Sequence, residues 1–234
     1  MMKNKNFDDF QDITLSLNPD PRCPCVLVLD TSGSMNEVRP GESRSPVDAL
    51  NDGLDTLVSD LHSDPLARRR AEIACVTFGG DVKLVTEFAT VEDLELPHLV
   101  AGGATPMGEA VIAALELVER RKVEYKNNGI SYYRPIILLI TDGAATDNIK
   151  QAVKLCQEAE SAKKVAIFPI GVAGADMQQL SHFSGTKEPL MLSGVKFDEL
   201  FRWLSASLSA VSASNPAAAG DGVNIPSPQG WAVF

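Results

Sequence analysis

The chain has 234 residues, of which 44% are hydrophobic and 22% are charged, and this composition is typical of a globular protein and not of a disordered one. Acidic residues outnumber basic ones by 31 to 21, which gives a formal net charge of −10. We therefore expect no broad nucleic-acid-binding surface, because phosphate binding depends on clustered Lys and Arg. The acidic field instead favours a cation or a partner with a basic face.

No segment of the sequence has the pattern of a signal peptide or a membrane span. Residues 1–11 are polar and acidic, and even an apolar run such as 136–140 is far shorter than the roughly 20 residues that cross a bilayer. From this we expect a cytoplasmic protein.

The four cysteines do not form a disulfide framework in a chain of this length; they are Cys23, Cys25, Cys75 and Cys156. The first two form a C-P-C motif without a second pair or a His at zinc-ligand spacing. We expect reduced, structural thiols, and a redox or metal role for Cys23 and Cys25 is the alternative.

Apolar runs alternate with helical patterns along most of the chain, which predicts an α/β fold. Residues 25–30 are continuously apolar until Asp30, as in a buried central strand. Ser45 and Pro46 suit the N-cap and the first position of a helix whose apolar stripe extends to Leu61.

A hairpin and a second long helix follow. Residues 73–78 and 82–88 flank a Gly-Gly-Asp turn at 79–81, which predicts two antiparallel strands. Thr105 and Pro106 begin the helix, which should end before the Asn-Asn-Gly sequence at 127–129.

The remaining elements continue the alternation. Their expected ranges are a strand at 135–141, a helix capped by Asp147 and extending to about Ala162, a strand at 165–170, a short helix at 177–183, a brief strand at 190–192 and a final helix over 197–211.

The pattern divides the chain into three parts. Residues 1–20 are an N-terminal extension, 21–214 form one domain, and 215–234, rich in Ala, Gly, Pro and Ser, are a flexible C-terminal tail outside the fold. Trp231 and Phe234 in this tail are either incidental or the anchors of a short docking segment.

Three polar loops follow buried strands or open a helix. They carry the motifs D-T-S-G-S-M at 30–35, T-P-M-G at 105–108 and T-D-G at 141–143. Ligands of parallel sheets bind beyond the carboxyl ends of the strands. The loops offer hard oxygen donors, which suit Mg²⁺, Mn²⁺ or Ca²⁺; these donors are Asp30, Ser32, Ser34, Thr105 and Asp142.

Two other interpretations of these loops remain open. Asp and Ser often cap helices and form turns at strand ends, with no ligand involved. Asp30 is also a candidate nucleophile of a phosphoryl-transfer enzyme, but such enzymes need a second Asp two positions later, where this chain has Ser32.

The three motifs in this order resemble the metal-ion-dependent adhesion site (MIDAS) of von Willebrand factor A domains, and the resemblance covers nearly all of residues 22–214. Within that family the chain is most similar to the bacterial tellurium-resistance TerY-type proteins, through P-V-D-A-L-N-D-G-L at 46–54 and F-D-E-L-F-R-W-L-S at 197–205. The resemblance implies a doubly wound, mostly parallel six-stranded sheet, with one antiparallel edge strand and helices on both faces.

The resemblance also assigns roles to the polar residues. Ser32, Ser34 and Thr105 would coordinate the ion directly, while Asp30 and Asp142 would hold it directly or through water. The chain departs from the family pattern in two places. Its loop over residues 36–45 is longer, which places Glu37, Arg39, Glu42 and Arg44 near the site, and Ala104 separates the glycine pair from Thr105.

We therefore expect a metal-dependent protein–protein interaction module and not an enzyme; a Mg²⁺-dependent phosphoryl-transfer enzyme that uses Asp30 is the alternative. The ion would be Mg²⁺, Mn²⁺ or Ca²⁺, and the partner a protein that offers an Asp or Glu carboxylate to it. The resemblance further implies a bacterial tellurite or stress response, with a phosphatase or kinase among the candidate partners.

Overall fold

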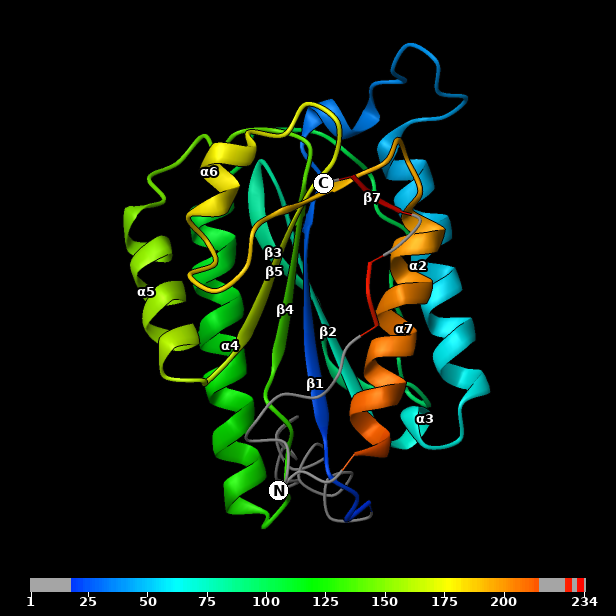
Figure 1. Ribbon diagram of the computed structural model, residues 1–234, viewed down its shortest axis with the longest axis vertical. Coiled ribbons are helices and arrows are strands. Elements are labelled where there is room, and N and C mark those ends of the chain that lie inside the picture. Colours follow the sequence, from blue (N-terminus) through cyan, green and yellow to red (C-terminus); the bar gives the residue numbers. More distant parts are fainter. Residues whose placement is uncertain (1–17, 215–225, 229–230, 234) are drawn as a thin grey trace, which may run out of the picture.

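The computed structural model describes residues 18–214, 226–228 and 231–233, which form a sheet covered by helices on both faces (Figure 1). Among these residues the sheet has seven strands in the order β3-β2-β1-β4-β5-β6-β7. They are β1 (Cys23–Asp30), β2 (Ala71–Gly79), β3 (Asp81–Thr90), β4 (Ile136–Thr141), β5 (Ala166–Gly171), β6 (Leu190–Leu192) and β7 (Ala232–Val233). The five inner strands are parallel, and β3 is antiparallel at one edge. The expected fold is confirmed, and the short antiparallel β7 extends the other edge.

Strand β1 lies at the centre of the sheet and is buried along its whole length. Leu27 and Leu29 belong to the core on one face of the sheet, whereas Val26 and Val28 belong to the core on the other. Burial of both faces explains the continuous apolar run in the sequence. The chain proceeds from β1 to β2 on one side and to β4 on the other, so the topological switch point lies between β1 and β4.

Two groups of helices cover the sheet (Figure 1). One face carries α2 (Pro46–Ser63), α3 (Ala67–Arg70) and α7 (Phe197–Ala213), and the other carries α4 (Met107–Asn127), α5 (Lys150–Ser161) and α6 (Met177–Ser181). Helix α2 begins where predicted, since the Ser45 side chain accepts a hydrogen bond from Asp48 N. Gly53 lets α7 approach α2, because a Cβ there would lie 2.7 Å from Cδ2 of Phe201.

The expected hairpin is confirmed by the antiparallel pairing of β2 and β3, but the prediction for Asp147 is wrong. Helix α5 begins only at Lys150. The Asp147 carboxylate instead accepts hydrogen bonds from the backbone N–H groups of Gly108 (3.1 Å) and Glu109 (2.8 Å). It therefore caps the first turn of α4, across a gap of 39 residues in the sequence.

The C-terminal residues that the structure describes are part of the fold, which corrects the expectation of a tail outside it. Trp231 is only 1% exposed and belongs to the core beside α7. Its ring centroid lies 5.3 Å from that of Trp203, and Trp203 Nε1 donates a hydrogen bond to Pro226 O (2.7 Å). Burial of these aromatic rings stabilises the segment against the sheet edge. Phe234 lies outside the described residues, as do 215–225 and 229–230.

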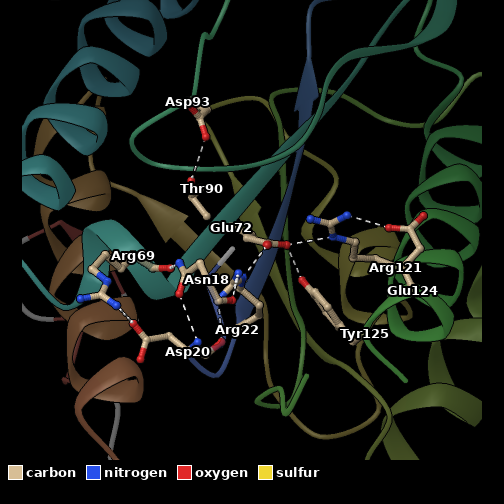
Figure 2. Close-up of polar contacts among 10 residues, drawn as sticks. All are labelled: Asn18, Asp20, Arg22, Arg69, Glu72, Thr90, Asp93, Arg121, Glu124 and Tyr125. Carbon is tan, nitrogen blue, oxygen red and sulfur yellow. Dashed lines mark hydrogen bonds and ion pairs between the residues drawn. The ribbon is translucent and has the colours of Figure 1, made fainter. Parts of the chain in front are cut away.

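A buried ionic cluster joins elements at the end of the sheet opposite to the carboxyl end of β1 (Figure 2). Glu72 at the start of β2 accepts hydrogen bonds from Nε of Arg22 and Nε of Arg121, both at 2.9 Å, and one from the Tyr125 hydroxyl. Burial, and next the negative charge of Glu72, raise the pKa of Tyr125, so its hydroxyl remains a donor. The cluster connects β2 to α4 and to the residues before β1.

The expected N-terminal extension, residues 1–20, is described only from Asn18 onward. Asn18 Nδ2 donates to Arg69 O (2.9 Å), and the Asp20 carboxylate lies 2.8 Å from Nη2 of Arg69 (Figure 2). These contacts attach the end of the extension to α3.

All four cysteines are free and buried, in agreement with the expectation of structural thiols. Burial raises the pKa of the Cys23 and Cys75 thiols to about 12, which disfavours the reactive thiolate. Within the described part of the chain, no helix has the length and apolar character needed to cross a membrane.

Candidate functional site

The five predicted oxygen donors come from three loops at the carboxyl end of the sheet, and we call them the strand-end site: Asp30, Ser32, Ser34, Thr105 and Asp142. Asp30 is the last residue of β1, and Asp142 follows the last residue of β4. These strands are parallel neighbours, with Leu29 paired to Ile140, so their polar ends emerge side by side. The site thus lies at the switch point of the sheet.

Hydrogen bonds connect four of the five residues. Ser34 Oγ donates to Asp142 Oδ1 (2.7 Å), and the hydroxyl oxygens of Ser32 and Ser34 lie 3.2 Å apart. Asp30 Oδ1 accepts from Ser32 N at 2.7 Å, an interaction that shapes the turn after β1. The D-x-S-x-S spacing therefore brings both hydroxyls toward the carboxylates, as predicted.

Thr105 is positioned by its backbone and not by its hydroxyl, which makes no hydrogen bond to the other four residues of the site. Thr105 N donates to Thr146 Oγ1 (3.1 Å), and Thr146 N donates to Thr105 O (2.9 Å). The preceding Gly103 O accepts from Gly33 N (3.1 Å), which joins the Thr105 loop to the turn after β1. The three loops therefore meet, and Thr105 is 7% exposed.

A glycine permits this close approach. Gly103 has φ of 83°, and a Cβ on it would lie 2.6 Å from the backbone of Gly80. Ala104, the residue that departs from the family pattern, accepts a hydrogen bond from Gly80 N through its carbonyl oxygen (2.8 Å). The extra residue is therefore held by the turn between β2 and β3.

The two carboxylates of the site are buried. Asp30 is 0% exposed and Asp142 is 3% exposed. Burial, with a further contribution from the negative charge of Asp142, raises the pKa of Asp30, while hydrogen bonds from Ser32 and Thr141 oppose the rise. Two buried negative charges close together are unfavourable, so a cation bound between them would stabilise the folded protein.

Arg39, from the long loop over residues 36–45, reaches the site. Its Nη2 lies 2.5 Å from Asp142 Oδ2, and its side chain is 21% exposed. Glu37 N donates a hydrogen bond to Ser34 O (3.0 Å), so its backbone adjoins the site while its side chain is exposed. Glu42 is adjacent to Gly194, and Arg44 pairs with Asp52 of α2. Of the four residues expected near the site, Arg39 contacts it through its side chain and Glu37 through its backbone, whereas the contacts of Glu42 and Arg44 are with other residues.

Sequence reasoning missed two supporting roles in these loops. The hydroxyl of Thr141 donates to Asp30 Oδ2 and thereby occupies the second oxygen of that carboxylate. Gln179 Oε1 accepts from Ala145 N (2.6 Å), which ties the loop after β4 to α6. The role of Thr141 could have been predicted, because it is a hydroxyl residue at the end of a strand that neighbours β1. The contact of Gln179 depends on tertiary structure alone and had no such signal in the sequence.

The donor set fits a hard divalent cation. It combines two carboxylates with three neutral hydroxyls, the kind of ligands that Mg²⁺ and Mn²⁺ prefer. No group of three or more His, Cys, Asp or Glu side chains in the described residues is placed to hold a metal ion, and the strand-end site itself has only two carboxylates beside its three hydroxyls.

Comparison with known proteins agrees with the architecture. Residues 25–200 match the model of the von Willebrand factor type A domain, which is more than half of the chain. The chain belongs to this family. An uncharacterized protein of Mycobacterium tuberculosis is 29% identical over 125 residues, which cover 52% of this chain but only 17% of that relative.

Solved structures share the fold at low sequence identity. The pilus adhesin SpaC from Lactobacillus rhamnosus GG superposes with a TM-score of 0.63 at 12% identity, over 83% of this chain and 32% of the adhesin. Proximal thread matrix protein 1 from the mussel byssus superposes with a TM-score of 0.52 at 16% identity, over 82% of this chain and 49% of that protein. The MIDAS motif of that mussel structure is occupied by zinc. This chain therefore spans less than half of each of these relatives.

Proposed function

We propose that this von Willebrand factor A domain binds one divalent cation at the strand-end site and uses it to recognise a carboxylate on a protein partner. The observation that carries the proposal is the convergence of Asp30, Ser32, Ser34 and Asp142 in one hydrogen-bonded group at the switch point. Thr105 completes the donor set from the adjacent loop.

The chemistry of the donors supports recognition over a purely structural ion. Three of the five proposed ligands are neutral hydroxyls, so within this donor set only the two carboxylates carry negative charge. An acidic side chain from a partner then gains a charge-assisted interaction that water does not match. Oxygen ligands favour Mg²⁺ or Mn²⁺, with Ca²⁺ as a further candidate, and the zinc in the mussel relative supports a divalent ion in general.

The geometry of Asp30 argues against the alternative of a phosphoryl-transfer enzyme. Both of its carboxylate oxygens accept hydrogen bonds, one from Ser32 N and one from Thr141 Oγ1, and the residue is 0% exposed. A nucleophile needs a free oxygen that a substrate can approach in line. We therefore infer a non-enzymatic module. An assay with acyl- and aryl-phosphates, with and without Mg²⁺, tests this directly, and turnover that Asp30→Asn abolishes would contradict it.

We extend the proposal to a biological setting through the TerY-type resemblance at residues 46–54 and 197–205. It supports a cytoplasmic role in a bacterial tellurite or stress response, with a phosphatase or kinase as the partner. Growth of a deletion strain on tellurite, with and without complementation by Asp142→Ala, tests it. Full resistance without the protein would contradict this setting.

Partner binding that depends on the ion tests the central proposal. Capture from native lysate should be lost with chelator and restored by Mg²⁺. Thr105→Ala should weaken capture strongly while the melting temperature changes by only a few degrees, because one hydroxyl contributes little stability. Thr86→Ala, which removes a half-buried hydroxyl of β3 that donates to Glu95 O (3.0 Å) outside the strand-end site, is the control. If the ion is only structural, Thr105→Ala lowers stability first, and binding falls only as a consequence.

A further inference from the structure

The guanidinium of Arg39 occupies one oxygen of the Asp142 carboxylate. Arg39 Nη2 lies 2.5 Å from Asp142 Oδ2, while Ser34 occupies Oδ1. Both oxygens of a proposed metal ligand are therefore already engaged by groups of this chain. Arg39 is a cation on the carboxylate that the proposed ion would use.

The ion pair of Arg39 with Asp142 leaves one hydrogen-bond donor of the guanidinium without a partner among the described residues. This donor, Nη1 of Arg39, is buried. On one side lies Gly174, where an added Cβ would be 3.6 Å from Arg39 Nη2 and 3.0 Å from Asp142 O. The guanidinium thus fits between the β4 and β5 loops, but it leaves a buried polar atom unpaired, which weakens the contact.

The loop that carries Arg39 has few other attachments. Val38 is 58% exposed, and a Cβ added at Gly41 would meet no atom within 4 Å. A turn closed by Glu42 N donating to Arg39 O (3.0 Å) holds the loop locally, and Glu42 lies beside Gly194. No residue of 36–45 belongs to either core, so we expect Arg39 to move away from Asp142 without repacking of the cores.

We propose that Arg39 is a built-in competitor of the divalent ion: it holds Asp142 in the ion-free protein and must leave when the ion binds. Two positive charges on one buried carboxylate repel each other strongly, because little water screens them. Ion binding is then coupled to release of the loop over residues 36–45. This loop lies above α2, at the end of the molecule where the carboxyl end of β1 lies (Figure 1). This inference rests on the proposed ion site and concerns its regulation.

The decisive comparison uses two arginines of the same loop. Arg39→Gln removes the competitor, whereas Arg44→Gln removes an equal charge from an exposed pair with Asp52. Long-range electrostatics change similarly in both variants, so a difference between them reports the contact with Asp142. Arg39→Lys keeps the charge but loses the planar fork, and should fall between wild type and Arg39→Gln.

Mn²⁺ titration by calorimetry measures the effect at fixed ionic strength. We take the contact between Arg39 and Asp142 to be formed in about nine of ten ion-free molecules, so only about one in ten can bind the ion. The apparent affinity is proportional to that fraction, and Arg39→Gln should therefore bind Mn²⁺ about tenfold more tightly than Arg44→Gln. Hydrogen exchange should also show that Mn²⁺ increases exchange at residues 37–43 in wild type, and that Arg39→Gln has this faster exchange without the ion.

The outcomes separate the two proposals. Equal Mn²⁺ affinity of Arg39→Gln and Arg44→Gln would overturn the competition while leaving the ion site intact. Hydrogen exchange of residues 37–43 that stays unchanged in wild type at saturating Mn²⁺ would also overturn the competition. If neither wild type nor either variant binds Mn²⁺, the ion site itself is wrong, and the role of Arg39 is refuted with it.

Discussion

The hydroxyl of Ser34 donates a 2.7 Å hydrogen bond to the carboxylate of Asp142, although 108 residues separate the two in the sequence. This contact crosses the switch point of the sheet and joins the turn after β1 to the loop after β4. Because the parallel pairing of β1 and β4 sets the distance between the loops, the donors are organised by the rigid sheet. The fold therefore holds these polar side chains together without a ligand.

The raised pKa of Asp30 predicts a pH dependence of the ion-free protein. Burial places this pKa above the usual Asp value of about 4. Between the two values the folded protein holds a proton that the unfolded chain has released, so this carboxyl's contribution to the free energy of unfolding falls as pH rises. Urea unfolding without divalent ions should show that Asp30→Asn lacks this decrease. Identical pH slopes in wild type and variant would contradict the assignment.

Glu72 should be essential for stability. Replacement by Gln leaves the buried charges of Arg22 and Arg121 without their common partner (Figure 2), at an expected cost of about 3–5 kcal/mol in the free energy of unfolding. Glu92→Gln, which breaks an exposed pair with Arg68, should cost no more than about 1 kcal/mol. Denaturant unfolding checks both, and a similar small cost for the two variants would show that the cluster adds little.

The C-terminal segment should contribute to stability through Trp231. Trp231→Ala removes a buried ring beside Trp203 and should cost about 3 kcal/mol. Trp231→Phe should cost less, because it keeps an aromatic ring and removes an indole N–H that has no hydrogen-bond partner among the described residues. Thermal unfolding, with the exposed Ser227→Ala as control, measures this. An unchanged melting temperature in Trp231→Ala would mean that the segment does not pack in solution.

Asp147 should stabilise helix α4. Asp147→Ala removes the acceptor for two backbone N–H groups and should cost about 1–2 kcal/mol. Asp147→Asn keeps one acceptor oxygen and should recover part of the loss. Chemical denaturation distinguishes the two variants, and equal losses would indicate that negative charge matters more than the hydrogen bonds.

The sheet and the clustering of the polar residues at its strand ends were predictable from the sequence because they depend on local patterns. The apolar run before Asp30 identified the central strand, and the D-x-S-x-S spacing identified hydroxyls that would face one carboxylate. Parallel pairing then placed Asp142 beside them.

The contacts missed from the sequence are long-range and lack a periodic pattern. Asp147 stands close before α5 and matches an N-cap signal there, but the loop geometry directs it to α4. Trp231 lies in a segment whose composition resembles a linker, and only the contact of its ring with Trp203 in the folded chain reveals its burial. Arg39 was expected near the site, yet its pairing with Asp142 depends on how the long loop folds back.

An anomalous difference map from crystals grown with MnCl₂ tests the ion site most directly. We expect one strong peak among Asp30, Ser32, Ser34, Thr105 and Asp142, with ligand distances of about 2.0–2.3 Å, and we expect Arg39 to have moved from Asp142 Oδ2. Crystals of Asp142→Ala should lack the peak. No peak at the strand-end site in wild type at saturating Mn²⁺, or a peak only at another position, would contradict the proposed metal-dependent recognition.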